Sequence, residues 1–344
     1  MAVSSLPTLM PSASFFQAVF YRIRLGFIKL LTDTIMKILS LRGIGDPSIQ
    51  PTFTKSYPCQ PTLTHRIFVP KAWKSGDPAL PLYIDLHGGG YALFRPQIDD
   101  KFCTWLANEH NILVISVQYL LAPAHKFPKP IYGVLNVITA ILEDESLPAF
   151  DKSKVCIGGF SAGANLALTV PQLPELRGKV GGIIAFYPPT NFVTPVEETL
   201  ASRPAHAGPD VLARLADLFK WGYISTGQDL ADPLLSPVFA NREDLPPKVC
   251  IIGCEFDMLC KNAEILANKL AGSGTGKRIG TDAAWEQNGI RWEMMIGRYH
   301  AFDTPLVEPR GAERRAKLDQ RRKAMWSNAD RVIWTPIQMD VLFL

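Results

Sequence analysis

A serine flanked by glycines stands at a predicted strand-to-helix turn, where its hydroxyl is placed to act as a nucleophile. Residues 159–163 read Gly-Phe-Ser-Ala-Gly, which fits the pattern G-x-S-x-G with Ser161 at its centre. Apolar residues alternate before this turn, as in a buried strand, and a helix-forming segment at residues 164–170 follows it and stops at Pro171. Glycines permit a sharp turn, and the free N–H groups at a helix start stabilise an oxyanion. The motif therefore predicts a nucleophilic Ser161. The alternative is an ordinary glycine-rich turn that contains a serine.

A second glycine-rich segment follows an earlier predicted strand. Residues 80–86 form a short apolar strand that runs into His87-Gly88-Gly89-Gly90. Consecutive glycines let backbone N–H groups approach a ligand closely, and such a segment supplies half of the oxyanion hole in hydrolases with a nucleophile elbow. Alone, the segment is also compatible with a flexible loop. Combined with G-x-S-x-G at this distance, it favours an oxyanion site.

The elements that must position these residues alternate between strands and helices. This alternation predicts an α/β fold with a mostly parallel central sheet that is flanked by helices. The predicted strands comprise residues 62–70, 80–86, 111–119, 154–158, 180–187, 248–253 and 291–296, and the predicted helices comprise residues 130–144, 164–170 and 262–270.

Together these motifs resemble the hormone-sensitive-lipase-like branch of the α/β-hydrolase superfamily, over roughly residues 50–305. Two positions depart from the family pattern: Leu120 and Ala124 stand where Arg and Glu are usual, which bears on local packing more than on chemistry. The matching segments are HGGG at residues 87–90, YRLAPE-x-x-FP at residues 119–128, G-x-S-A-G-x-N at residues 159–165 and DP-x-x-SP at residues 232–237.

The resemblance implies a catalytic triad. His300, in a segment similar to the family's H-G-F, would be the general base that takes the proton of Ser161. The family keeps its triad acid about one turn after the strand at residues 248–253, where Asp257 fits the spacing best and Glu255 is the rival. The acid would accept the imidazole Nδ1–H and stabilise the imidazolium.

The resemblance also implies the oxyanion donors. They would be the N–H groups of Gly89, Gly90 and Ala162. The residues that support the two motifs are His87, Gly88, Gly159 and Gly163.

The family's architecture divides the chain into a core and a helical cap. The aromatic side chains of Phe219, Trp221 and Tyr223 are candidates for lining an apolar substrate pocket, unless they pack inside the cap. The expected parts are N-terminal cap helices in residues 1–48, the α/β-hydrolase core in residues 49–189 and 236–310, inserted cap helices in residues 190–235, and a C-terminal helix and tail in residues 311–344.

The first forty residues are apolar but do not resemble a signal peptide. No positive charge precedes the apolar stretch, and Arg22, Arg24 and Lys29 interrupt it. No run reaches the roughly 18 uncharged apolar residues that a membrane span needs. The spacing of the charges over residues 14–41 predicts a pair of amphipathic helices that form part of a lid. The alternative is a helix that lies on a membrane surface, which would make residues 1–43 a peripheral membrane contact.

Composition narrows the class of protein. Hydrophobic residues make up 47% and charged residues 20% of the 344-residue chain, which is typical of a globular protein. The formal charge of +4 is small and its basic residues are mostly scattered, so nucleic-acid binding is not indicated. Six cysteines without C-x-x-C spacing favour buried free thiols over disulfides or zinc, and hence a reducing, cytoplasmic location.

Three later segments receive weaker assignments. Residues 271–289 are predicted to form a mobile loop, and the apolar residues 334–344 have no assignment. A basic helix is predicted within residues 311–330, with its charges on a solvated face; these are Arg314, Arg315, Lys317, Arg321, Arg322 and Lys323.

The sequence predicts a serine hydrolase that cleaves carboxylic esters through an acyl-enzyme, a chemistry that needs no metal or cofactor. Three alternatives remain. An acyltransferase or transesterase in natural-product biosynthesis, that is, secondary metabolism, would use the same triad. A formamidase is also compatible, although the HGGG segment is closer to the lipase branch. A non-catalytic receptor, like the plant gibberellin receptors, is disfavoured because those proteins lack the catalytic histidine and His300 is present here. Family members often dimerise, so a homodimer is an open expectation.

Overall fold

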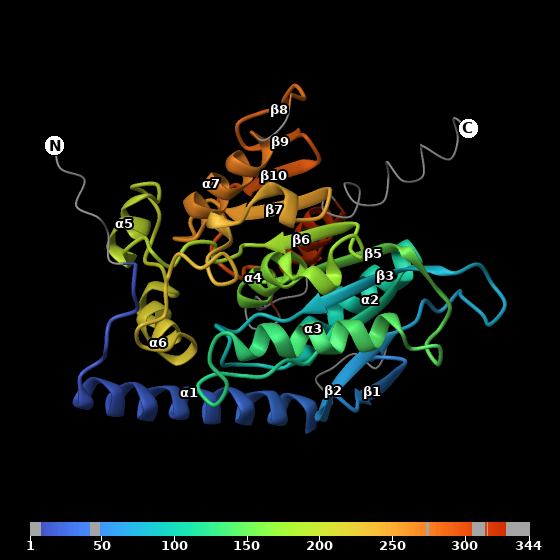
Figure 1. Cartoon of the computed structure of the whole chain (residues 1–344), viewed down its shortest axis with the longest axis horizontal. Helices are drawn as coiled ribbons and strands as arrows, with labels where there is room; N and C mark the ends of the chain where they lie inside the picture. Colours follow the sequence, from blue (N-terminus) through green and yellow to red (C-terminus); the bar gives the residue numbers. More distant parts are fainter. Residues whose placement is uncertain (1–7, 42–48, 273–274, 305–313, 315, 328–344) are drawn as a thin grey trace.

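A mixed ten-stranded sheet forms the centre of the part of the chain that the structure describes (Figure 1). The structure is a computed structural model, and it describes residues 8–41, 49–272, 275–304, 314 and 316–327. The strand order is β1-β2-β4-β3-β5-β6-β7-β10-β9-β8. The strands are β1 (Phe53–Tyr57), β2 (Gln60–Phe68), β3 (Leu80–Leu86), β4 (Leu113–Val117), β5 (Phe150–Phe160), β6 (Gly182–Phe186), β7 (Lys248–Cys254), β8 (Ile279–Gly280), β9 (Ala284–Gln287) and β10 (Ile290–Met295).

The middle of this sheet is parallel, as predicted. Each neighbouring pair in the row β4-β3-β5-β6-β7-β10 runs parallel. Antiparallel partners extend the row at both edges, with β1 and β2 at one edge and β8 and β9 at the other. Because the central strands are buried on both faces, their sequences read as nearly continuous apolar runs; every residue of β4 and β6 is buried.

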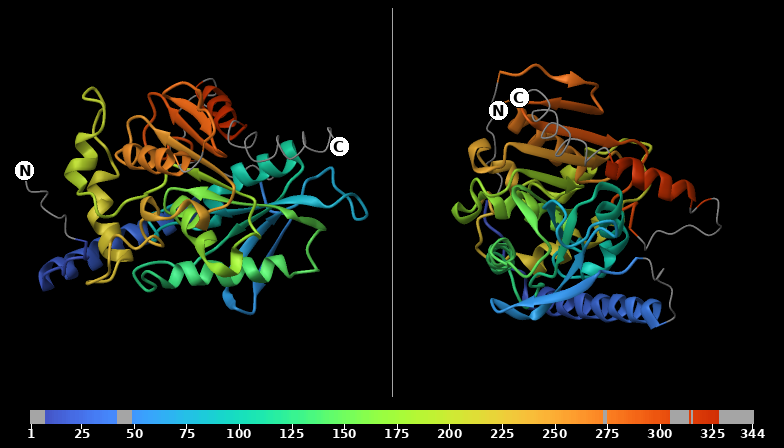
Figure 2. Two further views of the ribbon diagram at one scale, coloured as in Figure 1. Left: turned by 45° about the horizontal axis from the view of Figure 1, so that its top comes forward. Right: turned by 90° about the vertical axis from the view of Figure 1, so that its right-hand side faces the viewer.

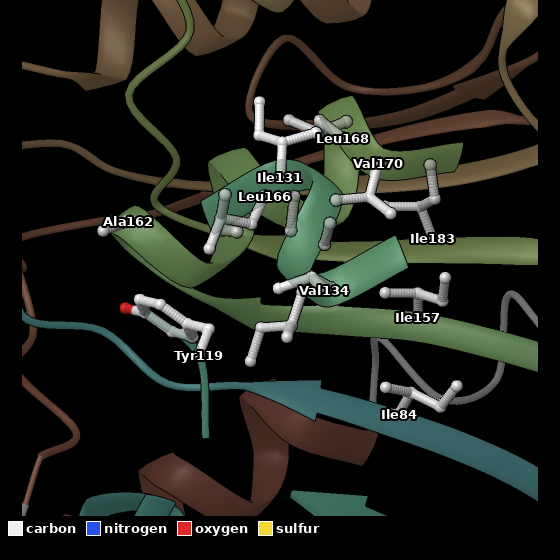
Figure 3. Packing of buried hydrophobic residues seen from close by; sticks show 14 of the residues in the cluster. Ile84, Tyr119, Ile131, Val134, Ile157, Ala162, Leu166, Leu168, Val170 and Ile183 are labelled. Atoms are coloured by element: carbon white, nitrogen blue, oxygen red, sulfur yellow. The ribbon is translucent and has the colours of Figure 1, made fainter. Parts of the chain in front are cut away.

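Alternate residues of these strands build two hydrophobic cores, one on each face of the sheet. In β3, Leu82 and Ile84 belong to the core that includes residues of the helices α3 (Lys129–Leu142), α4 (Ala162–Thr169) and α7 (Cys260–Ala271). Tyr83, between them, belongs to the second core, together with Phe102 of α2 (Asp100–His110) and Trp326 of the C-terminal helix. Figure 3 shows part of the first core, where side chains of the strands meet those of α3 and α4.

Helices cover both faces of the sheet, and further helices form a cap. The core helices are α2 (Asp100–His110), α3 (Lys129–Leu142), α4 (Ala162–Thr169) and α7 (Cys260–Ala271), and the cap helices are α1 (Phe15–Leu41), α5 (Val196–Ala201) and α6 (Ala213–Tyr223). The last two lie between β6 and β7, in the segment where inserted cap helices were expected, and α1 packs against α6.

The prediction of two N-terminal helices was wrong. Residues Phe15–Leu41 form one continuous helix, α1. The segment contains no proline, and its one glycine, Gly26, is tolerated within the helix. No helix among the described residues is long and apolar enough to cross a membrane.

The segment at residues 271–289, predicted to be a mobile loop, contains two short strands, β8 and β9, in its second half. Strands β8 and β9 pair with each other, and β9 pairs with β10. Asn288 and Gly289 connect β9 to β10 with φ of 53° and 75°. Positive φ at both residues of a two-residue turn is what an Asn-Gly hairpin requires, so this signal was present in the sequence.

The C-terminal helix is only partly the solvated basic helix that was predicted. It is described at residues 314 and 316–327, and Lys317, Arg321 and Lys323 are exposed in it. Arg322 is instead fully buried, and its guanidinium donates hydrogen bonds to the Thr304 carbonyl oxygen at 2.7 Å and to Asp319 Oδ1 at 3.0 Å. Arg315 and the apolar tail at residues 334–344 lie outside the described residues.

Candidate active site

Ser161 occupies the sharp turn between β5 and α4. Its backbone has φ 52° and ψ −116°, a conformation that costs a residue with a side chain about 1–3 kcal/mol. Two backbone hydrogen bonds hold it there: the Ser161 N–H donates to Phe186 O at 2.9 Å, and the Asn165 N–H donates to Ser161 O at 3.1 Å. The strained turn places the serine hydroxyl at the carboxyl end of β5, as in a nucleophile elbow.

Gly159 and Gly163 let the turn approach the neighbouring strand closely. A Cβ at either glycine would lie well inside contact distance of the Leu86 carbonyl oxygen at the end of β3. The spacing of the two glycines around Ser161 therefore has a steric cause. Only hydrogen atoms fit between the elbow and β3.

Replacing Gly163 with alanine is expected to destabilise the protein by about 3 kcal/mol, because backbone atoms of β3 and α4 must move apart. Thermal or urea unfolding measures this effect. Gly181→Ala is the matched control, since a Cβ there meets its nearest atoms at ordinary contact distances of 3.6 and 3.7 Å. Equal stability of the two variants would contradict the packing argument.

His300 and Asp257 form a hydrogen-bonded chain with Ser161. His300 Nε2 lies 2.9 Å from Ser161 Oγ, and His300 Nδ1 lies 2.6 Å from Asp257 Oδ2. The Asp257 side chain is fully buried, and its Oδ1 accepts the Leu259 N–H at 3.0 Å. Ser161 follows β5, Asp257 follows β7 and His300 follows β10, so three parallel strands of one sheet bring the three side chains to its carboxyl edge, with β6 between β5 and β7.

Glu255, the rival acid, has a different partner. Its Oε2 accepts the Gly297 N–H at 2.6 Å, and its own N–H donates to Met295 O at 3.1 Å. Glu255 therefore braces the segment that leads from β10 to His300, and Asp257 is the acid that contacts the imidazole.

The surroundings of His300 raise its pKa above the ordinary value of 6.5. Burial lowers the pKa, but the adjacent Asp257 carboxylate raises it by charge and by its hydrogen bond, and the net direction is upward. A base in this position must be neutral to accept the serine proton.

The pH dependence of activity follows from that direction. Activity is expected to fall as the pH decreases through the pKa of His300, with the midpoint of the acid limb above 6.5. A profile of kcat/KM against pH measures the midpoint in the free enzyme. A midpoint well below 6.5 would show that the Asp257 carboxylate does not control the imidazole.

The HGGG segment lies directly against the elbow. A Cβ on Gly88 would lie 3.5 Å from the Ser161 Cβ, and Gly90 lines the same cavity as Ser161 and Ala162. Gly89 has φ +116° and Gly90 has φ +59°, values that suit glycine. Ala162 is the first residue of α4, so its N–H has no carbonyl acceptor within that helix.

His87, the first residue of the HGGG segment, anchors the segment to the protein core. Its ring is buried and stacks on the Tyr119 ring at a centroid distance of 4.3 Å, and the Tyr119 hydroxyl donates to His87 O at 2.9 Å. Burial lowers the pKa of His87 to about 4, so the imidazole is neutral at pH 7. Its Nδ1 lies 2.8 Å from Gly88 O, and because a carbonyl oxygen only accepts, Nδ1 carries the hydrogen.

An apolar cavity opens above Ser161. Its empty space, counted with its open mouth, is about 760 Å³. Cap side chains form part of its wall, namely Val196 and Thr199 of α5, Leu212, and Ala216, Phe219 and Lys220 of α6. Core residues complete it, including Pro189, Met258 and Asn262.

Of the three aromatic residues predicted to line a pocket, only Phe219 is among the cavity residues. Tyr223 is buried and stacks on Tyr91 at a centroid distance of 3.7 Å. Trp221 packs against Tyr21 of α1 at 5.6 Å. The two residues therefore pack the cap against its surroundings, as the alternative interpretation had it.

A buried polar cluster behind His300 was not predicted from the sequence. The Tyr187 hydroxyl donates to Asp303 Oδ1 at 2.6 Å, and Trp326 Nε1 donates to Asp303 Oδ2 at 3.4 Å. The Tyr187 ring also meets the His300 ring edge-on at 4.9 Å. The cluster connects the C-terminal helix to the segment that carries His300, across more than twenty residues of sequence. No local pattern signals such a connection.

The fold and this geometry define an α/β-hydrolase, and comparison with known proteins gives the same class. A family model described as alpha/beta hydrolase fold matches residues 83–282, more than half of the chain, and the chain belongs to this family. Within it, the predicted membership of the hormone-sensitive-lipase-like branch is confirmed.

Relatives and solved structures are similar over different lengths. An arylesterase of Saccharolobus solfataricus is 30% identical over 56% of this chain and 63% of its own, and carboxylic ester hydrolase LipN of Mycobacterium tuberculosis is 30% identical over 58% and 55%. The matched regions thus span less than two thirds of both relatives. The esterase of Pyrobaculum calidifontis is 25% identical, with a TM-score of 0.66 over 93% of this chain and 99% of its own.

Proposed function

We propose that the protein is a serine hydrolase that cleaves carboxylic esters. The main observation in support is that Ser161, His300 and Asp257 are connected by hydrogen bonds. Ser161, the first of the three, also lines an apolar cavity together with Gly90 of the HGGG segment. The similarity to an arylesterase and to a carboxylic ester hydrolase supports the same class of substrate.

The proposed reaction has two halves. Ser161 Oγ attacks the carbonyl carbon of the ester, and its proton moves to His300 Nε2. The N–H groups of Gly89, Gly90 and Ala162 stabilise the oxyanion of the tetrahedral intermediate. Its collapse breaks the ester C–O bond, and the alcohol leaves with the proton from His300.

Water completes the cycle. His300 removes a proton from a water molecule, whose oxygen attacks the acyl carbon of the Ser161 ester. Collapse of the second intermediate releases the carboxylic acid and returns the proton to Ser161. Asp257 accepts the Nδ1–H throughout and stabilises the imidazolium that forms in each half.

The cavity favours an ester with an apolar acyl or alcohol part. Its cap wall is mainly aliphatic and aromatic, and the cation of Lys220 is turned to Phe192 O, to which its Nζ donates at 2.9 Å. An apolar wall binds hydrocarbon through the area that it removes from water.

A fluorophosphonate probe tests the nucleophile directly. The probe is expected to phosphonylate Ser161 in the wild-type protein, with the adduct located by peptide mass spectrometry, and to leave Ser161→Ala unlabelled. Hydrolysis of short-chain 4-nitrophenyl esters should accompany labelling. A folded protein that neither reacts with the probe nor hydrolyses esters would contradict the proposal and favour a receptor on this fold.

The oxyanion role of the HGGG segment has its own test. Gly89→Ala is expected to lower kcat/KM by at least about a hundredfold, because an alanine cannot keep φ +116° and its Cβ would collide with Leu93 O. Gly76→Ala is the matched control, since Gly76 has φ +99° with open space around it and is not among the residues that line the cavity. If the Gly89→Ala enzyme kept its activity, the HGGG segment would not supply the oxyanion donors.

A further inference from the structure

The helix α1 presents its apolar side away from the protein. Large apolar side chains recur from Phe16 to Leu30 with spacings of four and three residues, and Ile38 follows eight residues later, which places them all on one face of an α-helix. Their exposed fractions lie between 43% and 83%. This stripe, called the outer stripe below, consists of Phe16, Phe20, Ile23, Phe27, Leu30 and Ile38.

The opposite face of α1 is fastened to the cap and core. Leu25 is buried, and the Tyr21 ring contacts the Trp221 ring of α6 at 5.6 Å. Arg24 donates a hydrogen bond to Arg214 O at 3.0 Å, and Lys29 Nζ donates to Ala92 O at 2.7 Å. These contacts fix the rotation of the helix about its own axis. Because the inner face is held against the protein, the outer stripe faces away from it.

The helix also lies at the periphery of the molecule. In Figure 1 it runs along the outside, beneath α6 and α3, and the right view of Figure 2 again shows it at the edge. A contiguous apolar stripe on such a helix exceeds the scattered apolar residues that ordinary protein surfaces carry.

The charge of α1 indicates which kind of partner binds the outer stripe. The helix carries Arg22, Arg24, Lys29 and Lys37 against one acid, Asp33, and Arg22 and Lys37 are exposed beside the outer stripe. A second copy of the chain would bring an equally basic helix against it. An anionic lipid surface complements both the basic flanks and the apolar stripe, which is the pattern of an interfacial helix.

We propose that α1 is an interfacial helix that docks the protein on an anionic lipid surface, with the outer stripe buried among the acyl chains. The proposal concerns a surface apart from Ser161 and does not depend on the esterase activity. If that activity holds, docking also brings α6, which forms part of the cavity wall, next to the lipid, where apolar esters are concentrated.

Vesicle sedimentation tests the docking with the full chain. The wild type is expected to bind phosphatidylcholine vesicles that contain phosphatidylserine. Phe20→Glu combined with Phe27→Glu should lower the bound-to-free ratio by at least about tenfold, since two carboxylates would enter the stripe. Ile265→Glu combined with Ile279→Glu is the matched control, because both isoleucines are exposed elsewhere, and it should bind like the wild type.

A charge-reducing variant separates the two contributions. Arg22→Gln combined with Lys37→Gln should weaken binding to phosphatidylserine vesicles without changing the weaker binding to pure phosphatidylcholine. Thermal unfolding establishes that each variant is folded, independently of any esterase activity.

Two results would overturn the proposal. One is a wild type that does not sediment with phosphatidylserine vesicles. The other is a dimer in analytical ultracentrifugation that Phe20→Glu with Phe27→Glu dissociates while vesicle binding is absent, which would assign the outer stripe to a second copy of the chain.

Discussion

Ser161→Ala is expected to lower kcat for ester hydrolysis by about 10⁴-fold or more, with little change in KM. The substitution removes the atom that forms the acyl-enzyme but leaves the cavity and the glycine segment in place. Substrate binding should therefore persist, while the covalent step cannot occur. Steady-state kinetics with a short-chain 4-nitrophenyl ester measures both parameters.

The fold of this variant should be unaffected, which makes the result interpretable. Alanine occupies φ 52° with a strain similar to that of serine, and the backbone hydrogen bonds to Phe186 and from Asn165 do not involve the hydroxyl. The free energy of unfolding should change by less than about 1 kcal/mol. Ser202→Ala, at an exposed cap serine, controls for loss of a hydroxyl. Turnover within tenfold of the wild type would show that another residue is the nucleophile.

The sheet was predictable because its strands carry their signal locally. The segment at residues 80–86 was predicted as a strand and is β3 with the same bounds, and residues 248–253 were predicted where β7 ends one residue later. Both are short apolar runs that fit only where both faces are buried. The hydrogen-bonded residues Ser161, Asp257 and His300 follow such strands, so the sheet order explains why they meet.

The elements that were predicted wrongly depend on contacts with distant parts of the chain. The charges of α1 suggested two amphipathic helices facing a core, but the helix is continuous and only its narrow inner face, with Leu25 at its centre, is buried. The strands β8 and β9 have only two and four residues, and the pairing of β9 with β10 and of β8 with β9 stabilises them more than their own composition does. The one local signal in this region is Asn288-Gly289, a sequence typical of the tight turn that connects β9 to β10.

The environment of the site was the least predictable part. Sequence spacing favoured Asp257 but kept Glu255, two residues away, as a rival, and the orientation of the chain after β7 shows which carboxylate contacts the imidazole. The contacts of Arg322 and Trp326 with the segment after His300 likewise require the C-terminal helix to return to the core. Such contacts are set by tertiary packing and leave no periodic pattern in the sequence.

Asp257→Asn is expected to lower kcat by about 10³ to 10⁴-fold while the structure remains intact. The reason lies in the second hydrogen bond of the carboxylate. Asp257 Oδ1 accepts the Leu259 N–H, so an asparagine must keep its oxygen there and turn its NH₂ group toward His300 Nδ1. The imidazole then has to accept at Nδ1 and carry its hydrogen on Nε2, where it cannot take the serine proton.

The same substitution should change the pH profile. Without the adjacent carboxylate, burial, which lowers the pKa of His300, is opposed only by the weaker charges of Asp210 and Asp303, so the acid limb of the residual activity should shift to lower pH. Glu255→Gln is the matched control, because a glutamine oxygen can still accept the Gly297 N–H, and it should retain activity within a few-fold. If Glu255→Gln instead lost more activity than Asp257→Asn, the acid that supports His300 during turnover would be Glu255, and the loop before His300 would have to rearrange when substrate binds.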